Sequence, residues 1–195
     1  MTQDRISAQL AFLTEADRLK SIQRATTLCD ASRRENSAEH SWHIALYALT
    51  LAEHAERPVN IGRVIQMILL HDIVEIDAGD APIHGGPDPA IQAIKEQKAA
   101  DRIFGILPAD QRDHYRALWE EFEAAETDDA IFAKSIDRVQ PLIANLETGG
   151  GSWIEYDVTA QQLETRVGVK VRRGAPKVWQ ALKQRIDTWF AENRG

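Results

Sequence analysis

The sequence predicts an all-α fold with seven or more helices. Apolar residues recur at helical spacing along almost the whole chain, whereas the alternation typical of strands is nearly absent. Glycine and proline concentrate in one loop-rich stretch, residues 79–89. The 195 residues, 44% of them hydrophobic and 27% charged, are enough for one domain with a substantial core. We therefore expect a single domain over residues 1–195, with no internal repeat.

Three helices are predicted in the first part of the chain. The first is indicated by Ile6, Leu10, Leu13 and Ile22. The second should begin at Asn36, because Asn36 followed by Glu39 resembles a capping box. One face of this helix carries Trp42, Ala45, Leu46 and Leu49. Asn60 can cap the third helix. Its apolar stripe, which is broad enough to suggest burial on most sides, consists of Ile61, Val64, Ile65, Ile68 and Leu69.

The remaining helices follow the loop at residues 79–89. Three of them are indicated by Ile91, Ile94, Ile103 and Phe104, by Tyr115, Leu118, Trp119 and Phe122, and by Ile131, Phe132, Ile136, Val139 and Ile143. The glycines at positions 149–151 should end the last of these. A terminal helix contains Val178, Leu182, Ile186, Trp189 and Phe190.

Charge and cysteine content restrict the partners and the compartment. The net charge of -7 disfavours a nucleic-acid-binding surface, which needs a basic stripe, but a few local cations can still serve one phosphate. The single cysteine, Cys29, predicts a reducing compartment without a disulfide framework. The chain starts without a signal-peptide pattern and has no apolar run near the roughly 18 residues of a membrane span. We therefore expect a cytoplasmic protein with no membrane partner.

Four residues far apart in the chain are good ligands for a divalent metal: His40, His71, Asp72 and Asp137. His71 and Asp72 end a strongly apolar helical run, and Asp137 is flanked by apolar residues that predict a core-facing position. Coordinating side chains at buried positions are unfavourable unless their lone pairs are satisfied. A metal would satisfy them and would also make water nucleophilic near neutral pH. Each residue alone could be a hydrogen-bonded core group or a cap, but the four together favour a metal site.

The chain resembles the HD-domain phosphohydrolases, and within them the metal-dependent 5'-deoxynucleotidases. The H…HD…D signature is carried by His40, His71, Asp72 and Asp137. Further similarity lies in the segments 18–20, 34–41, 71–75, 79–80, 118–123 and 134–137. The resemblance covers roughly residues 8–148, which we take as the motif-bearing core. Residues 152–195 are expected to form a C-terminal helical extension.

The resemblance implies a helical bundle in which His40, His71, Asp72 and Asp137 hold one divalent metal ion. Mixed nitrogen and oxygen ligands do not select the metal, so Mn, Co, Zn, Fe, Ni and Mg all remain possible. It also implies a small phosphorylated substrate and a homodimer.

Further site residues follow from the same resemblance. Glu75 would orient or deprotonate the attacking water, with Asp72 also at the catalytic centre. Arg24 would bind the phosphate, a role that suits a guanidinium because it can donate two parallel hydrogen bonds. Asp80 would contact the sugar hydroxyl, although a turn at this position explains an aspartate equally well. The 5'-deoxynucleotidase pattern has a tryptophan after the arginine, and here the residue is Ala25, so selection for deoxyribose by that ring is expected to be lost.

The expected function is a metal-dependent phosphohydrolase that releases phosphate from a nucleoside 5'-monophosphate or a similar small phosphate monoester. A phosphodiesterase or a hydrolase of a signalling nucleotide is the main alternative. A non-catalytic, metal-stabilised regulatory or binding protein is an alternative of another class. Two-iron oxygenases of related fold need extra histidine ligands between the HD pair and the last aspartate. His84 and His114 lie in that interval, but their context does not resemble that pattern.

Overall fold

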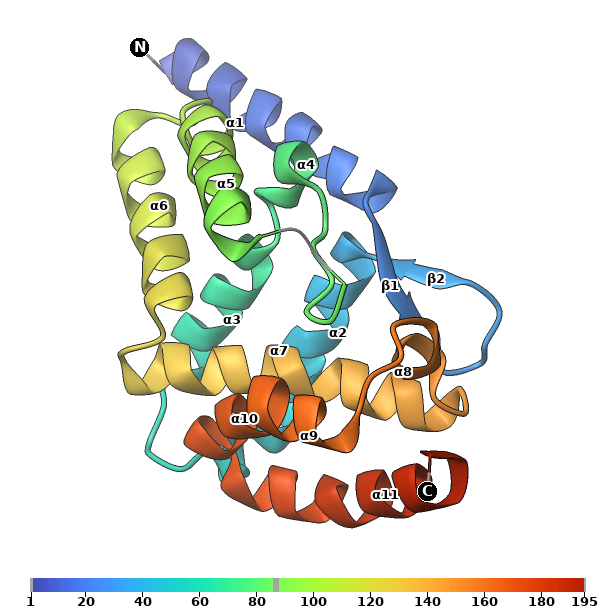
Figure 1. Ribbon diagram of the computed structural model, residues 1–195. Coiled ribbons are helices and arrows are strands. Elements are labelled where there is room, and N and C mark those ends of the chain that lie inside the picture. Colours follow the sequence, from blue (N-terminus) through green and yellow to red (C-terminus); the bar gives the residue numbers. More distant parts are fainter. Residues whose placement is uncertain (1, 86–87, 195) are drawn as a thin grey trace.

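The computed structural model describes residues 2–85 and 88–194 and shows a helical protein with one small two-stranded sheet in that part of the chain (Figure 1). The all-α prediction is therefore confirmed. Gly86 and Pro87 of the predicted loop lie outside the described residues. None of the helices in the described ranges is long and apolar enough to cross a membrane.

The longer helices are α1 (Thr2–Ala16), α2 (Ser37–Leu51), α3 (Ile61–His71), α5 (Pro89–Phe104), α6 (Ala109–Ala124), α7 (Asp128–Glu147) and α11 (Pro176–Arg194). Shorter ones are α4 (Glu75–Ala78), α8 (Gly151–Glu155), α9 (Ala160–Leu163) and α10 (Val169–Gly174), with a π-helical turn, η3 (Glu164–Gly168), between the last two. Two 3-10 turns are η1 (Asp17–Ser21) and η2 (Ala52–His54). The strands β1 (Gln23–Thr27) and β2 (Arg34–Asn36) pair in antiparallel fashion.

The predicted helix starts are confirmed at Asn36 and Asn60. The Asn36 side chain accepts a hydrogen bond from the Glu39 backbone N–H, and the Glu39 carboxylate accepts one from the Asn36 N–H. The Asn60 side chain accepts a hydrogen bond from the Arg63 backbone N–H. These caps satisfy N–H groups that a helix start leaves unpaired, and they fix where α2 and α3 begin.

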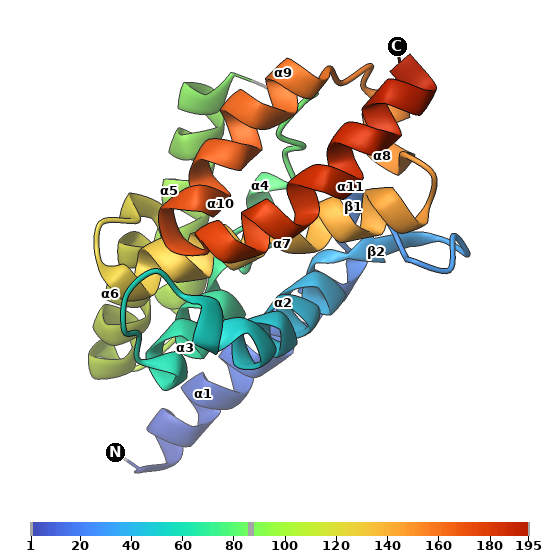
Figure 2. The same ribbon diagram turned by 90° about the horizontal axis from the view of Figure 1, so that it is seen from below.

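Helix α7 is the centre of the molecule. It contacts α2, α3 and α6 on one side and α10 and α11 on the other; Figure 1 shows it running across the lower half of the molecule, between these two groups of helices, and Figure 2 shows it from below. Asp137, near its midpoint, is buried as the sequence predicts. The terminal helix α11 also forms as predicted, with Trp189 and Phe190 buried against Trp153.

The structure differs from the predicted fold in three details. Ile22 is not part of the first helix, because α1 ends at Ala16 and the chain passes through η1 into β1. The hairpin of β1 and β2 was not predicted, since its strands are short and their register is irregular. The apolar face of α2 also lies outward: Trp42 is 65% exposed and Leu49 55% exposed.

Candidate metal centre

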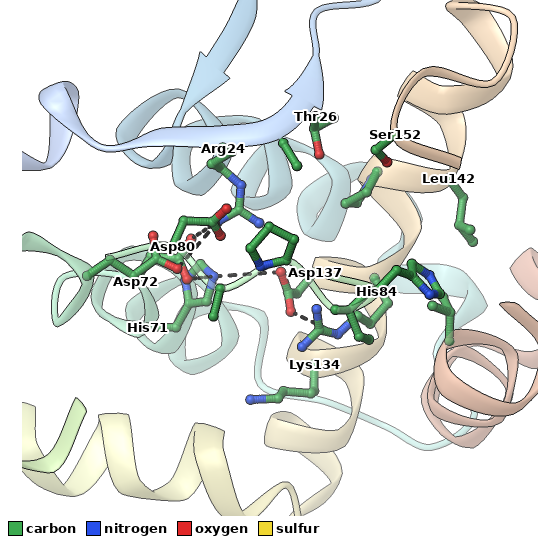
Figure 3. Close-up of a pocket in the computed structure, with 18 of the residues that line it drawn as sticks. Arg24, Thr26, His71, Asp72, Asp80, His84, Lys134, Asp137, Leu142 and Ser152 are labelled. Atoms are coloured by element: carbon green, nitrogen blue, oxygen red, sulfur yellow. Dashed lines mark hydrogen bonds and ion pairs between the residues drawn. The ribbon is translucent and has the colours of Figure 1, made fainter. Parts of the chain in front are cut away.

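The structure brings the four predicted metal ligands together in the interior. His40 lies in the first turns of α2, His71 ends α3, Asp72 follows it as the C-cap, and Asp137 comes from α7. All four side chains are buried. His40 Nε2 lies 3.0 Å from Asp137 Oδ1, His71 Nε2 lies 3.7 Å from the same oxygen, and His71 Nε2 lies 2.9 Å from Asp72 Oδ1. Figure 3 shows His71, Asp72 and Asp137 around one pocket.

These distances fit a shared cation. Ligand atoms that each lie about 2.0–2.2 Å from one first-row metal ion must be within about 4.4 Å of one another. The three measured separations meet this condition. The ligand atoms of His40, His71 and Asp72 all lie within 4.8 Å of one another, and Asp137 adjoins this group through its contacts with the two histidines. In addition, His71 Nε2 is buried without a hydrogen-bond partner in the described residues, although Asp72 Oδ1 is only 2.9 Å away. An imidazole nitrogen facing two carboxylates offers the mixed nitrogen and oxygen ligands that divalent metals bind in proteins.

Neighbouring groups fix the orientation of His71. Its Nδ1 lies 2.6 Å from the carbonyl oxygen of Ile68. Because a carbonyl can only accept, Nδ1 carries a proton, and Nε2 is the ring nitrogen that faces the cluster. Trp119 donates from Nε1 to the His71 carbonyl oxygen at 3.2 Å, and the Phe122 ring packs on the imidazole at 4.8 Å between centroids. Trp119 and Phe122, which belong to the segment 118–123 of the sequence resemblance, therefore hold His71 in place.

His40 is oriented by two residues that the sequence analysis did not select. Gln140 Oε1 accepts a hydrogen bond from His40 Nδ1 at 3.1 Å, and Gln140 Nε2 donates to Glu35 at 3.0 Å. Both partners are buried. Gln140 lies one helical turn after Asp137, and this spacing on a buried helix face is the signal that could have identified it. Such outer partners set the tautomer and the direction of a ligating histidine.

The charges of the cluster favour anionic carboxylates. Burial raises the pKa of Asp72, but the opposing effect of His71 and Arg24 is larger, and the pKa lies below its ordinary range. Burial likewise raises the pKa of Asp137, while Arg138, His40 and His71 bring it well below the ordinary value. Two buried aspartates held as anions provide the negative charge that a divalent cation would balance.

Arg24, on β1, reaches into the same pocket. Its Nη1 donates to Asp72 Oδ2 at 2.8 Å and lies 3.4 Å from Asp80 and 3.7 Å from Glu75. Its Nε lies 3.5 Å from Glu35. Burial lowers the pKa of Arg24, but Asp72, Glu75 and Asp80 outweigh this effect and raise it. The guanidinium is thus permanently charged and shared among four carboxylates, as Figure 3 shows for Asp72 and Asp80.

Glu75, the first residue of α4, is buried and faces the same guanidinium. Ser37 donates from Oγ to Glu75 Oε2 at 2.5 Å. Burial and the charges of Asp72 and Asp80 raise the pKa of Glu75 well above its ordinary value, although Arg24 opposes them. A carboxyl group that is buried, hydrogen-bonded and close to a charged cluster has the properties of a proton-transfer group.

The pocket extends from this cluster to the C-terminal helices. Ala25 and Thr26 of β1 line it near Arg24, and His84 lines it from the loop after α4. The C-terminal part contributes Ser152, Trp153, Tyr156, Leu163 and Val167. The metal-ligand group found among the described residues contains neither His84 nor His114, and His114 is exposed on α6.

The chain is similar to known proteins over most of its length. The family model described as HD domain matches residues 16–179. The human 5'-deoxynucleotidase HDDC2 is 28% identical over 136 residues, which are 69% of this chain and 65% of that protein. A 5'-deoxynucleotidase of Enterobacter sp. (strain 638) is 28% identical over 169 residues, covering 80% of this chain and 82% of the relative. A crystal structure from Magnetospirillum magnetotacticum MS-1, described as a predicted metal-dependent phosphohydrolase, is 47% identical with a TM-score of 0.90 over 96% of both chains.

The chain therefore belongs to the HD domain family. The matched region extends past residue 148 and includes the C-terminal segments that line the pocket. The chain matches about two thirds, 65%, of the length of the human relative.

Proposed function

We propose that this protein is a metal-dependent phosphohydrolase that releases phosphate from nucleoside 5'-monophosphates or similar small phosphate monoesters. The observation that carries the proposal is the convergence of four metal-ligand side chains: His71, Asp72 and Asp137 line one pocket with Glu75, and His40 contacts Asp137 behind it. The names of the curated relatives, 5'-deoxynucleotidases, support the substrate class.

The proposal assigns a role to each group. The four ligands would hold one divalent ion, with Mn, Co, Zn, Fe, Ni and Mg as candidates, and such an ion supplies Lewis-acid polarisation and activates water. Glu75 accepts the proton of the attacking water and returns it to the leaving alkoxide. Ser37 holds the Glu75 carboxylate in position. Arg24 stabilises charge on the phosphate oxygens through N–H groups not directed at the carboxylates.

The sugar side of the pocket is formed by Ala25 and Asp80. The Asp80 carboxylate accepts a hydrogen bond from the Ala25 backbone and lies 3.4 Å from Arg24. These contacts hold it at the pocket wall, where it can also accept a hydrogen bond from a sugar hydroxyl. The methyl group of Ala25 leaves the space that a large ring would occupy. The proposal therefore includes ribonucleotides among the substrates.

A phosphate-release panel tests this function. Deoxyribo- and ribonucleoside 5'-monophosphates are supplied with Mn, Co, Zn or Mg, beside an Asp72→Ala variant. We expect turnover with at least one metal, no turnover in the variant, and a ratio of deoxyribo to ribo rates within about tenfold, because one missing steric contact changes discrimination by only about 1–3 kcal/mol. Silence across the panel, with metal bound to the protein, would exclude monophosphate hydrolysis and favour a diester, a signalling nucleotide or a non-catalytic role.

The proposal also includes a homodimer. On α2, Trp42, Leu46 and Leu49 are 65%, 47% and 55% exposed and share one helix face, so they form an apolar surface of the kind that protein partners cover. Sedimentation equilibrium should give twice the chain mass, and Trp42→Asp together with Leu46→Asp should reduce it to one chain. A monomeric mass for the unmodified protein at all concentrations would contradict the dimer.

A further inference from the structure

Arg138 lies beside the metal cluster and makes no hydrogen bond to the described residues. It follows Asp137 on α7, lines the pocket, and has a side chain that is 24% exposed. Its Nε is buried and lies 3.5 Å from Asp137 Oδ2, a separation that does not give a hydrogen bond. Leaving a buried donor unpaired costs free energy, and a guanidinium has five N–H donors. A group absent from the protein itself is therefore the natural partner of this side chain.

The other long cations at the pocket already donate hydrogen bonds to protein carboxylates. Lys134 donates to Glu123 at 2.8 Å and lies over the Phe122 ring at 4.3 Å. Arg24 is shared among Glu35, Asp72, Glu75 and Asp80. Among the Arg and Lys side chains that line the pocket in the described part of the chain, Arg138 alone donates no hydrogen bond to a protein group.

Cations near Arg138 act on two neighbouring groups, His84 and Lys170. Burial, together with Arg166 and Arg138, lowers the pKa of His84 to about 4. Burial, with Arg138 and Lys134, also lowers the pKa of Lys170, and the acidic groups nearby only partly oppose this. Cations that disfavour further protonation of their neighbours attract an anion to the same place.

The position of Arg138 relates this anion to the metal cluster. Asp137 presents Oδ1 to the two histidines and Oδ2 to Arg138. Arg24 contacts the other cluster carboxylate, Asp72. The two guanidinium groups thus approach the cluster from β1 and from α7, and Figure 3 shows Arg24 and Lys134 on these two sides of the pocket.

We propose that Arg138 binds the phosphate group of the substrate directly, as a second guanidinium beside the metal cluster. This inference rests on the proposed function for the identity of its ligand, a phosphate monoester or its product, inorganic phosphate. The planar N–H groups of Arg138 can donate two parallel hydrogen bonds to phosphate oxygens. Such bonds would also satisfy the donors that the protein leaves unpaired.

Calorimetric binding of inorganic phosphate to the metal-loaded protein tests this inference without requiring turnover. Arg138→Gln should weaken phosphate binding by about 10- to 100-fold, the usual effect of losing hydrogen bonds to a charged group. Arg138→Lys should recover only part of the loss, because lysine keeps the charge but not the fork of donors. Metal affinity, measured by a separate titration, should change by far less than the roughly 10- to 100-fold typical of losing a hydrogen-bonded partner of a ligand, because Arg138 makes no hydrogen bond to Asp137.

Arg166→Gln is the matched control. Arg166 also acts on the charge of His84, but it bonds the backbone of Ile83 and does not line the pocket. Its variant should bind phosphate like the unmodified protein. Unchanged phosphate binding in Arg138→Gln, or a parallel loss of metal and phosphate, would overturn the inference, the second result by assigning Arg138 to the support of Asp137. Weakened phosphate binding without any hydrolysis of monophosphates would uphold it and refute the proposed enzyme activity.

Discussion

Replacing Glu75 with glutamine is expected to lower kcat by about 10²- to 10⁴-fold, the usual contribution of a positioned general acid–base group. The amide keeps the shape of the carboxylate and can still accept the hydrogen bond from Ser37, so the site should stay assembled. What is lost is the ability to take a proton from water and return it to the leaving group. Steady-state phosphate release at a series of substrate concentrations measures kcat and KM for both proteins.

Metal content and thermal stability separate this role from a structural one. Glu75→Gln should bind one metal ion per chain and melt within a few degrees of the unmodified protein. Asp77→Asn is the control on the same short helix, because Asp77 points to Arg102 and away from the cluster. It should keep kcat within about twofold, as surface substitutions normally do. Loss of the metal or of the fold in Glu75→Gln would mean that this glutamate supports the site and does not transfer protons.

Removing the metal with a chelator is expected to abolish phosphate release and to lower the melting temperature by roughly 10 °C. A ligand present at a thousand times its Kd stabilises the folded state by about 4 kcal/mol. For a chain of this size each kcal/mol shifts Tm by about 2–4 °C. Without the ion, the carboxylates of Asp72 and Asp137 are both buried beside His71 Nε2, which has no hydrogen-bond partner among the described residues. Scanning calorimetry before and after metal addition measures the shift.

Variants show whether this shift comes from the predicted cluster. Asp72→Ala should show no shift on metal addition, whereas Asp187→Asn, which changes an exposed carboxylate paired with Lys183, should show the full shift. A metal-induced shift that survives in Asp72→Ala would place the ion elsewhere in the protein.

The helices and the ligand residues could be predicted because each has a local signal. Capping pairs such as Asn36 with Glu39 fix helix starts, and an aspartate at a core-facing helix position, such as Asp137, requires a charged partner. The resemblance to the HD-domain phosphohydrolases depended on the order of several motifs along the chain and not on any one of them. Burial then followed the predicted periodicity in α7 and α11, but on α2 the apolar face lies outward, since nothing in a periodic pattern tells whether a face packs within the chain or against a partner.

The supporting contacts could not be predicted because they join distant segments. Gln140 meets His40 across 100 residues of sequence, and it meets Glu35 across 105. No sequence pattern separates Arg138 from a surface arginine. Its role can be inferred only from the structure, which shows that the neighbouring Arg24 and Lys134 already donate hydrogen bonds to carboxylates. Similarly, the pocket wall formed by Trp153 and Tyr156 depends on how the C-terminal helices fold back over α7.

The most direct test of the account is a titration of metal-free protein with Co²⁺, followed by the rate of phosphate release from a nucleoside 5'-monophosphate. We predict that the rate rises from background and saturates at one ion per chain, and that Asp72→Ala stays at background throughout. A rate that is independent of metal, that needs two ions per chain, or that persists in Asp72→Ala would contradict a single-metal centre built by His40, His71, Asp72 and Asp137.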